Sequence, residues 1–191
     1  MGRRYSKPLG RRTHSDTQAR ISTLNEEEAL SFLESLEQDP FLLLLDQVQD
    51  PRNLGACLRS AEGAGVDLVV IPSDRSVGLT EVVRHVAAGA AESLTLARVG
   101  NLSRFMGRLK DVGVRLVGTS DQATGSIFEA DLAGPIGLVC GAEGTGIRRL
   151  TADNCDLLAN IPMHGKVDCL NVSVATGICL FEIRRQRTFA S

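Results

Sequence analysis

The sequence contains no tryptophan and only one tyrosine among its 191 residues. Proteins that bind single strands by stacking successive bases need several aromatic rings, so this composition argues against that mode of binding. Long apolar runs are also missing: no stretch approaches the ~20 apolar residues of a membrane-spanning helix, and no signal-peptide core is present. With 43% hydrophobic and 23% charged residues, the composition is typical of a soluble globular domain.

Paired cysteine motifs are likewise missing. The number of cysteines is odd, none forms a C-x-x-C pair, and most stand in apolar runs. This pattern predicts buried thiols in a reducing, cytoplasmic setting and no disulfide framework. His164 and Cys169 are five residues apart, but two ligands do not make a metal site, so we expect no metal. The five cysteines are Cys57, Cys140, Cys155, Cys169 and Cys179.

Charge is distributed unevenly along the chain. The formal net charge is -2, yet residues 1–20 carry six basic side chains and one acidic one, so the remainder is acidic in balance. We interpret residues 1–22 as a flexible basic arm and residues 23–191 as a single domain. A basic arm indicates a polyanionic partner; a merely solvated tail is the alternative. The basic residues are Arg3, Arg4, Lys7, Arg11, Arg12 and Arg20.

Apolar runs of strand length alternate with segments of helical periodicity. This alternation predicts an α/β fold with a mostly parallel sheet and helices on both faces. The expected strands are Phe41–Leu45, Val66–Ile71, Ser93–Ala97, Val114–Gly118, Ile136–Cys140 and Leu157–Ile161. The expected helices are one capped by Asn25 with Glu28, one from Asn53 to about Glu62, then Thr80–Ala91, Leu102–Asp111 and Asn171 to about Arg187. The last of these has an apolar face that includes Val174, Ile178 and Phe181.

The last two expected strands each end in a loop marked by glycine or proline. Ligands of open α/β sheets bind beyond the carboxyl ends of the strands, so the two loops predict one small-molecule pocket. The first loop reads G-A-E-G-T-G, Gly141–Gly146, which is neither the dinucleotide fingerprint nor a phosphate loop. A plain strand-to-helix turn would explain its glycines but would not explain the carboxylate of Glu143.

A second motif, N-L-G-A-C-L-R, runs from Asn53 to Arg59. Gly55 within a helix costs ~1 kcal/mol relative to alanine, which indicates that another part of the chain packs closely there. Asn53 is most simply the cap of the following helix. A surface ion pair with Glu62 would account for Arg59.

Together with I-P-M-H-G-K-V-D-C-L-N-V-S-V-A near the C-terminus, these motifs occur in an order that resembles the SpoU-type (TrmH-like) 2′-O-ribose methyltransferases of the SPOUT class. The resemblance covers roughly Phe41 to Arg187 and is greatest to members that methylate a guanosine of 23S rRNA. It implies a deep C-terminal trefoil knot, a homodimer, structured RNA as partner and S-adenosylmethionine as cofactor.

The resemblance also assigns roles to individual residues. It implies that Arg59 is catalytic, as a general base or an electrostatic stabiliser, that Asn53 and Glu143 orient the substrate and Arg59, and that Asn171 fixes the cofactor loop or the target ribose. The implied cofactor-binding residues are Thr119, Gly141, Ile161, Met163 and Leu170.

Two departures from the family pattern leave alternatives open. Cys169 stands where serine is common, and a thiol is the weaker hydrogen-bond partner. Relatives usually carry a separate N-terminal RNA-binding domain, and we expect the basic arm to replace it only in part. A tRNA substrate therefore remains an alternative to rRNA, and a non-catalytic RNA-binding or ribosome-assembly protein is the alternative of another class.

Overall fold

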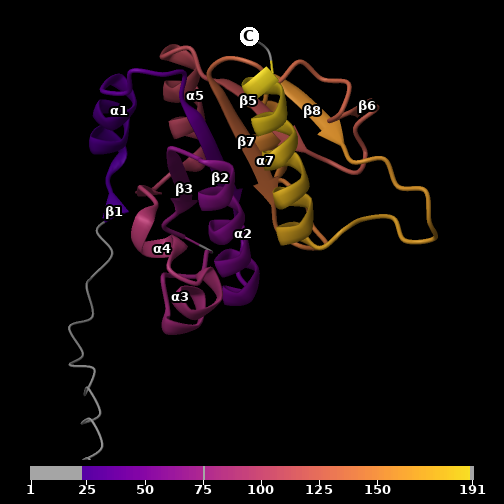
Figure 1. Cartoon of the computed structure of the whole chain (residues 1–191), viewed down its shortest axis with the longest axis horizontal. Coiled ribbons are helices and arrows are strands. Elements are labelled where there is room, and N and C mark those ends of the chain that lie inside the picture. Colours follow the sequence, from indigo (N-terminus) through magenta and orange to yellow (C-terminus); the bar gives the residue numbers. More distant parts are fainter. Residues whose placement is uncertain (1–22, 75, 190–191) are drawn as a thin grey trace, which may run out of the picture.

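The computed structural model describes residues 23–74 and 76–189; the predicted basic arm, residues 1–22, lies outside them. The described residues form one sheet of eight parallel strands in the order β1-β4-β3-β2-β7-β5-β8-β6 (Figure 1). The strands are β1 (Thr23–Leu24), β2 (Phe41–Asp46), β3 (Leu68–Pro72), β4 (Leu96–Val99), β5 (Arg115–Thr119), β6 (Gly125–Ser126), β7 (Ile136–Gly141) and β8 (Leu157–Asn160). The helices are α1 (Glu26–Glu34), α2 (Pro51–Ala64), α3 (Glu81–Ala87), α4 (Ala90–Ser93), α5 (Leu102–Asp111), α6 (Arg149–Asp153) and α7 (Val172–Phe189).

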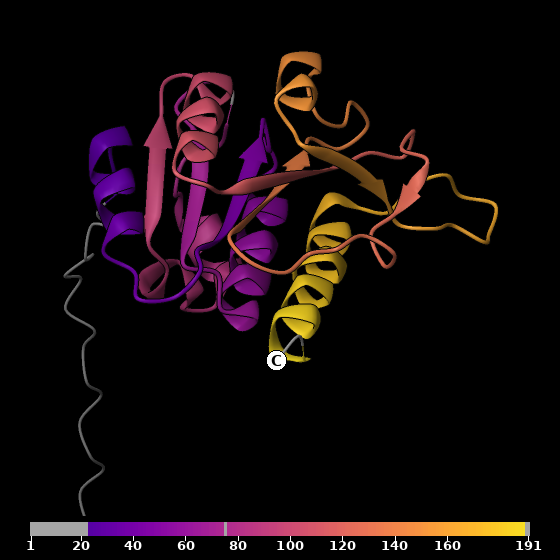
Figure 2. The same cartoon turned by 90° about the horizontal axis from the view of Figure 1, so that it is seen from above.

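Helices cover both faces of the sheet, as Figure 2 shows. On one face α2, α3, α4 and α7 pack over one apolar cluster; on the other, α1 and α5 pack over a second cluster, with Ile147 and Cys155 beside α6 at its margin. Strand β2 is buried along its whole length, as expected for a parallel strand covered on both sides. The predicted α/β architecture is therefore confirmed.

Two helix starts show how local sequence determines the boundaries. Helix α1 begins with the predicted capping box, in which Asn25 accepts from the backbone of Glu28 and Glu28 accepts from that of Asn25. The predicted cap of α2 is wrong. Asp50 caps that helix by accepting from the Arg52 amide, and Pro51 occupies the first helical position, where its fixed φ and missing N–H carry no cost. Asn53 lies inside the helix.

The helix expected over Thr80–Ala91 is broken into α3 and α4. Ala88 and Gly89 both have positive φ, 52° and 94°, a conformation that ends a helix. Because α4 then extends to Ser93, the following strand begins at Leu96 instead of the predicted Ser93.

The buried face of α7 also differs from the prediction. The helix contacts α2 and β7 through Val172, Cys179, Leu180 and Ile183, whereas Val174 and Phe181 remain 50% and 52% exposed. The helix is apolar on two sides, and periodicity alone could not decide which one faces the sheet.

The cysteines are all free. Cys57, Cys140 and Cys179 are buried as predicted, Cys155 is partly buried and Cys169 is exposed. Burial raises the pKa of Cys140 to about 11 and that of Cys57 to about 12, because a thiolate is poorly solvated in the core.

Among the described residues, no helix is both long and apolar enough to cross a membrane. Within the same two ranges, no group of three or more His, Cys, Asp or Glu side chains is arranged to hold a metal ion.

Candidate active site

Three side chains from distant parts of the chain meet at the carboxyl edge of the sheet. Asn53 of α2 donates through Nδ2 to Oε2 of Glu143 at 3.0 Å, and Asn171, just before α7, donates to Oδ1 of Asn53 at 3.1 Å. The Asn171 amide also lies 3.5 Å from Oε1 of Glu143. Each of the three motifs contributes one member, so the structure joins them in one hydrogen-bonded network.

The loop that carries Glu143 is tightly folded. Ala142 and Gly146 exchange two backbone hydrogen bonds, of 3.1 and 2.9 Å, and Gly144 and Gly146 have φ of 78° and 63°, which favours glycine. A Cβ on Gly141 would lie 2.0 Å from the backbone carbon of Gly146. The glycines thus allow the loop to cross directly over the end of β7.

A cavity of about 670 Å³ opens beside this loop. It lies between the loops that follow β5, β7 and β8, and its volume is in the range of sites for small organic ligands. All five predicted cofactor-binding residues line it: Thr119, Gly141, Ile161, Met163 and Leu170. The two adjacent loops therefore form one pocket.

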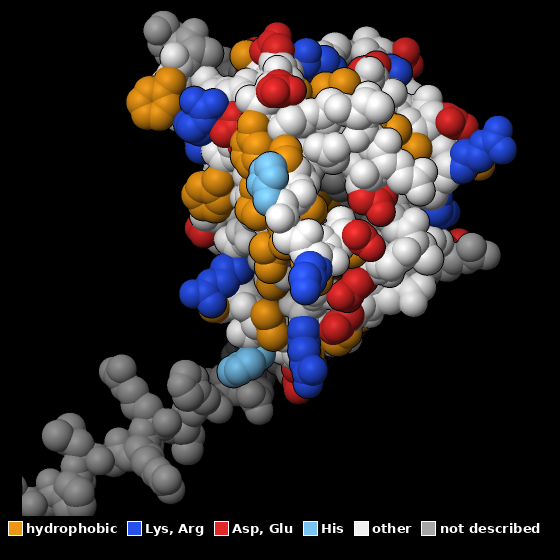
Figure 3. Space-filling model, turned by 90° about the vertical axis from the view of Figure 1, so that its right-hand side faces the viewer, with side chains coloured by type: hydrophobic (Ala, Val, Ile, Leu, Met, Phe, Trp, Pro, Cys, Tyr) orange, Lys and Arg blue, Asp and Glu red, His pale blue; other side chains and the backbone are white. Residues whose placement is uncertain are grey.

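The charged side chains that line the cavity are all acidic: Asp121, Glu143 and Asp168. Figure 3, which faces this side of the molecule, shows acidic side chains gathered along the edge of a hollow. Leu158, Ile161 and other lining residues are apolar. The site therefore suits an organic ligand that has an apolar part and carries positive charge, as the sulfonium and ammonium groups of S-adenosylmethionine do.

A second cavity, of about 300 Å³, adjoins the first. Its wall includes Gln47, Gln49, Asp50 and Asn53, and Glu143 lines both cavities. Glu143 therefore lies at the boundary between two binding spaces, an arrangement suited to holding a donor and an acceptor side by side.

Arg59 is not brought to this network. Its side chain is exposed, lines neither cavity and has no ion pair with Glu62 or any other described residue.

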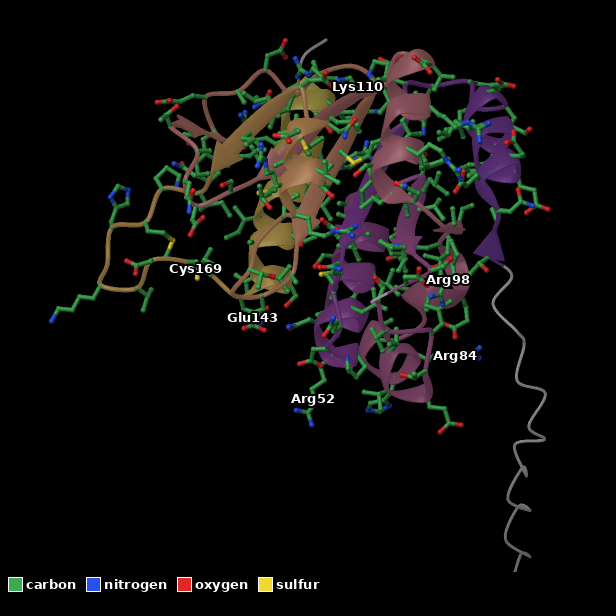
Figure 4. All side chains as sticks on the ribbon, turned by 180° about the vertical axis from the view of Figure 1, so that it is seen from behind. Arg52, Arg84, Arg98, Lys110, Glu143 and Cys169 are labelled. Carbon is green, nitrogen blue, oxygen red and sulfur yellow. The ribbon has the colours of Figure 1, made fainter. Side chains whose placement is uncertain are left out.

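Figure 4 shows Glu143 and Arg52 at the same end of the molecule, with Cys169 in the loop beside them. Cys169 is exposed and lines the larger cavity.

Several residues of the site were missed from the sequence. Asp121 and Asp168 line the first cavity, and Gln47 and Gln49 the second. A signal was present for most of them, because polar residues directly after a buried strand lie at the carboxyl edge of a parallel sheet. Gln47 and Gln49 follow β2 in this way, and Asp121 follows β5.

Comparisons with known proteins agree with this geometry. The model of the SpoU rRNA Methylase family matches residues 40–181. A 23S rRNA (guanosine-2′-O-)-methyltransferase RlmB from Shewanella oneidensis is 57% identical over 148 residues, which are 78% of this chain and 60% of that protein. The corresponding protein from Coxiella burnetii is 54% identical over 167 residues, 87% of this chain and 67% of the relative. The chain thus spans about two thirds of these relatives or less.

A solved structure shares the fold. The SpoU methyltransferase AviRb from Streptomyces viridochromogenes, in complex with AdoMet, superposes with a TM-score of 0.74 at 26% identity, covering 81% of this chain and 63% of that one. The family model spans most of the chain and includes all three motifs. The chain belongs to the SpoU rRNA methylase family.

Proposed function

We propose that this protein transfers a methyl group from S-adenosylmethionine to the ribose 2′-hydroxyl of a guanosine in 23S rRNA. One observation carries the proposal: the Asn53–Glu143–Asn171 network joins the three sequence motifs at the boundary of two adjoining cavities. The relatives that share more than half of their aligned residues with this chain are named for that reaction.

The larger cavity is the proposed cofactor site. Gly141, Ile161, Met163, Leu170 and Thr119 would hold the cofactor, which, when bound, supplies a methyl group already activated by a sulfonium. The acidic lining favours its positive charge, and the apolar side chains of Leu158 and Ile161 offer a surface for its adenosine part.

The smaller cavity is the proposed site of the target nucleotide. Asn53 and Glu143 present amide and carboxylate groups toward it, and such groups can orient a ribose hydroxyl. Arg59 carries a permanent cation with five donors. Its role is therefore to stabilise the developing alkoxide and grip a neighbouring phosphate.

A homodimer would bring Arg59 into the site. The exposed Val174 and Phe181 of α7 form an apolar strip, and the Phe181 ring lies beside Gly63 of α2, 3.7 Å from the position of a Cβ there. We infer that two copies pack through this strip and that the partner's Arg59 acts at the smaller cavity of the first copy, the proposed site of the target nucleotide. A twofold contact of this kind uses the same patch on both chains.

The outward side of α2 is the proposed contact with RNA. Arg52 and Arg59 are seven residues apart, so they lie on one side of the helix, about 10 Å from each other along its axis. Both are exposed, and neither forms an ion pair with another described residue. Arginines in this position would bind the phosphates that flank the target nucleotide.

Two further features follow from family membership as proposals. The chain leaves β8 near one edge of the sheet and returns to pack α7 against β7 and α2, a path that supports the expected trefoil knot. The free thiols support a cytoplasmic location.

The test is methylation with tritiated S-adenosylmethionine of unmodified 23S rRNA and, separately, of bulk tRNA, with labelled sites mapped by nuclease digestion. We expect label on a 2′-O-methylguanosine of the rRNA. Label in tRNA alone would keep the chemistry but overturn the substrate. The absence of label in both, despite measured cofactor binding, would favour a non-catalytic RNA-binding protein.

Arg59→Ala tests the catalytic assignment in the same assay. We expect methylation to fall at least tenfold while S-adenosylmethionine affinity is unchanged, because Arg59 does not line the cofactor cavity. Arg104→Ala is the matched control, since it removes an exposed arginine from α5 on the opposite face of the sheet. A wild-type rate for Arg59→Ala would refute the assignment.

A further inference from the structure

An ion pair whose carboxylate is fully buried lies directly behind the glycine loop and was not expected from the motifs. Asp46, the last residue of β2, is fully buried. Its carboxylate accepts from Arg148 three times: from Nη2 at 2.7 Å, from Nε at 2.8 Å and from the backbone amide at 3.1 Å. Arg148 is the residue at which the chain leaves the glycine loop and enters α6.

This pair is costly to build. Removing a carboxylate from water is expensive, and the Asp46 carboxylate is fully buried, whereas the Arg148 side chain keeps 43% of its surface exposed. An apolar side chain at the end of β2 would extend the run of Phe41–Leu45 without that cost. The presence of Asp46 is therefore better explained by what it holds in place than by stability.

The pair fixes one end of a loop whose backbone is otherwise easily deformed. Asp46 is in register with Gly141, where the loop begins, and it binds Arg148, just after the loop ends. Between these points the backbone depends on glycines with positive φ and on the paired amides of Ala142 and Gly146. Asp46 therefore connects both ends of the loop to the central strand.

We propose that the Asp46–Arg148 pair is a latch that positions the loop carrying Glu143 against the cofactor cavity. Neither residue lines either cavity, so both are positioning residues that act through the loop. With the latch intact, Gly141 and Gly146 form the cavity wall and Glu143 stays within reach of Asn53. The inference rests on the proposed function in taking this cavity as the cofactor site.

Two variants separate positioning from stability. Arg148→Ala leaves a buried, unpaired carboxylate and should lower the melting temperature, because an uncompensated charge is strongly destabilising. The double variant Asp46→Asn/Arg148→Ala removes that charge and should recover much of the melting temperature, but it still lacks both contacts of the arginine side chain and keeps at most the backbone amide contact. We expect S-adenosylmethionine affinity to fall by about tenfold to a hundredfold in both variants.

Arg104→Ala is the control, because it breaks another arginine–carboxylate pair, in which Nη2 of the exposed Arg104 contacts both carboxylate oxygens of Glu26 at 3.0 and 3.1 Å. We expect it to leave the cofactor affinity unchanged. If affinity in the double variant recovers together with the melting temperature, or if Arg148→Ala binds like the wild type, the latch is refuted.

Hydrogen exchange of the ligand-free protein gives a readout that does not depend on the cofactor. The amides of Ala142 and Gly146 should exchange faster in both latch variants, while those of β2 stay protected in the double variant. Unchanged exchange at the two loop amides would also overturn the latch. A wild-type protein that binds no S-adenosylmethionine would instead refute the proposed function, and the exchange data would still decide on the latch.

Discussion

Gly141→Ala is the most informative single substitution in this chain. The added Cβ would lie 2.0 and 2.1 Å from the carbonyl carbon and oxygen of Gly146 and 2.2 Å from the amide nitrogen of Ile147. Unbonded carbon atoms prefer separations of about 3.5 to 4.0 Å, so the added Cβ would overlap the backbone of Gly146 by ~1.5 Å. Relieving that overlap requires the loop to move by more than about 1 Å. All three atoms belong to the backbone, and no side-chain rotation can relieve the overlap.

The cost falls on both stability and binding. Overpacking of this kind destabilises by about 1 to 3 kcal/mol or more, and displacing the loop removes part of the wall of the cavity proposed for the cofactor. In the wild type, S-adenosylmethionine at a hundred times its Kd should stabilise the fold by about 2.7 kcal/mol, which raises Tm by about 5 to 10 °C for a domain of this size. We expect Gly141→Ala to lose this rise.

The assay is a thermal melt with and without S-adenosylmethionine, supported by titration calorimetry. Gly165→Ala is the matched control, because a Cβ there meets no atom within 4 Å and the residue lies in the neighbouring loop. It should keep the ligand-induced rise in Tm. If Gly141→Ala binds S-adenosylmethionine with wild-type affinity, the account of this loop as a cavity wall is wrong.

Three further predictions address the RNA contact, the dimer and the core. Arg52→Ala should raise the KM for RNA severalfold and reduce the salt dependence of RNA binding by about one counterion, while the cofactor affinity stays unchanged. If Arg104→Ala has equal effects, Arg52 has no specific role in binding RNA. Phe181→Glu should convert the proposed dimer to monomer in sedimentation analysis, because it places a charge in the apolar strip of α7; an unchanged mass would exclude that face. The buried thiol of Cys140 has its pKa raised by burial from 9.0 to about 11, so its contribution to stability is complete below pH 9 and is lost as pH rises toward 11. Urea titrations should therefore show the free energy of unfolding falling by up to about 1.4 kcal/mol per pH unit above pH 9 because of this thiol. If the free energy of unfolding of a Cys140→Ala variant falls equally steeply with pH, Cys140 does not contribute to this pH dependence.

The layered fold could be predicted because its signals are local. The apolar run Phe41–Leu45 specifies a strand buried on both faces, and the bounds of α5 were predicted exactly as the structure has them. The break at Ala88 could not be predicted in this way, because alanine favours helix and rarely adopts the positive φ that it has in the structure. The strand order also depends on long-range pairing that periodicity does not encode.

The site was predictable where side-chain chemistry conflicted with a simple structural role. Glu143 in a glycine turn is such a case, and its hydrogen bonds with Asn53 and Asn171 support the positioning role proposed for it. The close packing inferred at Gly55 is present, since a Cβ there would lie 2.7 Å from Cβ of Val86. Asp46 was missed because an aspartate at the end of a strand looks like ordinary turn chemistry until its burial and its partner, 102 residues away, are known.

The position of β7 has a consequence for synthesis of the chain. Strand β7 pairs with β2 on one side and β5 on the other, so neither inner edge is covered until residues 136–141 have left the ribosome. At about 5 to 20 residues per second, the edge of β2 stays unpaired for several seconds, and such an edge on a strand with five consecutive apolar residues is a template for aggregation. Newly made chains should therefore depend on chaperones during this interval, and the cavity proposed for the cofactor is assembled late, because its lining extends to Ala175.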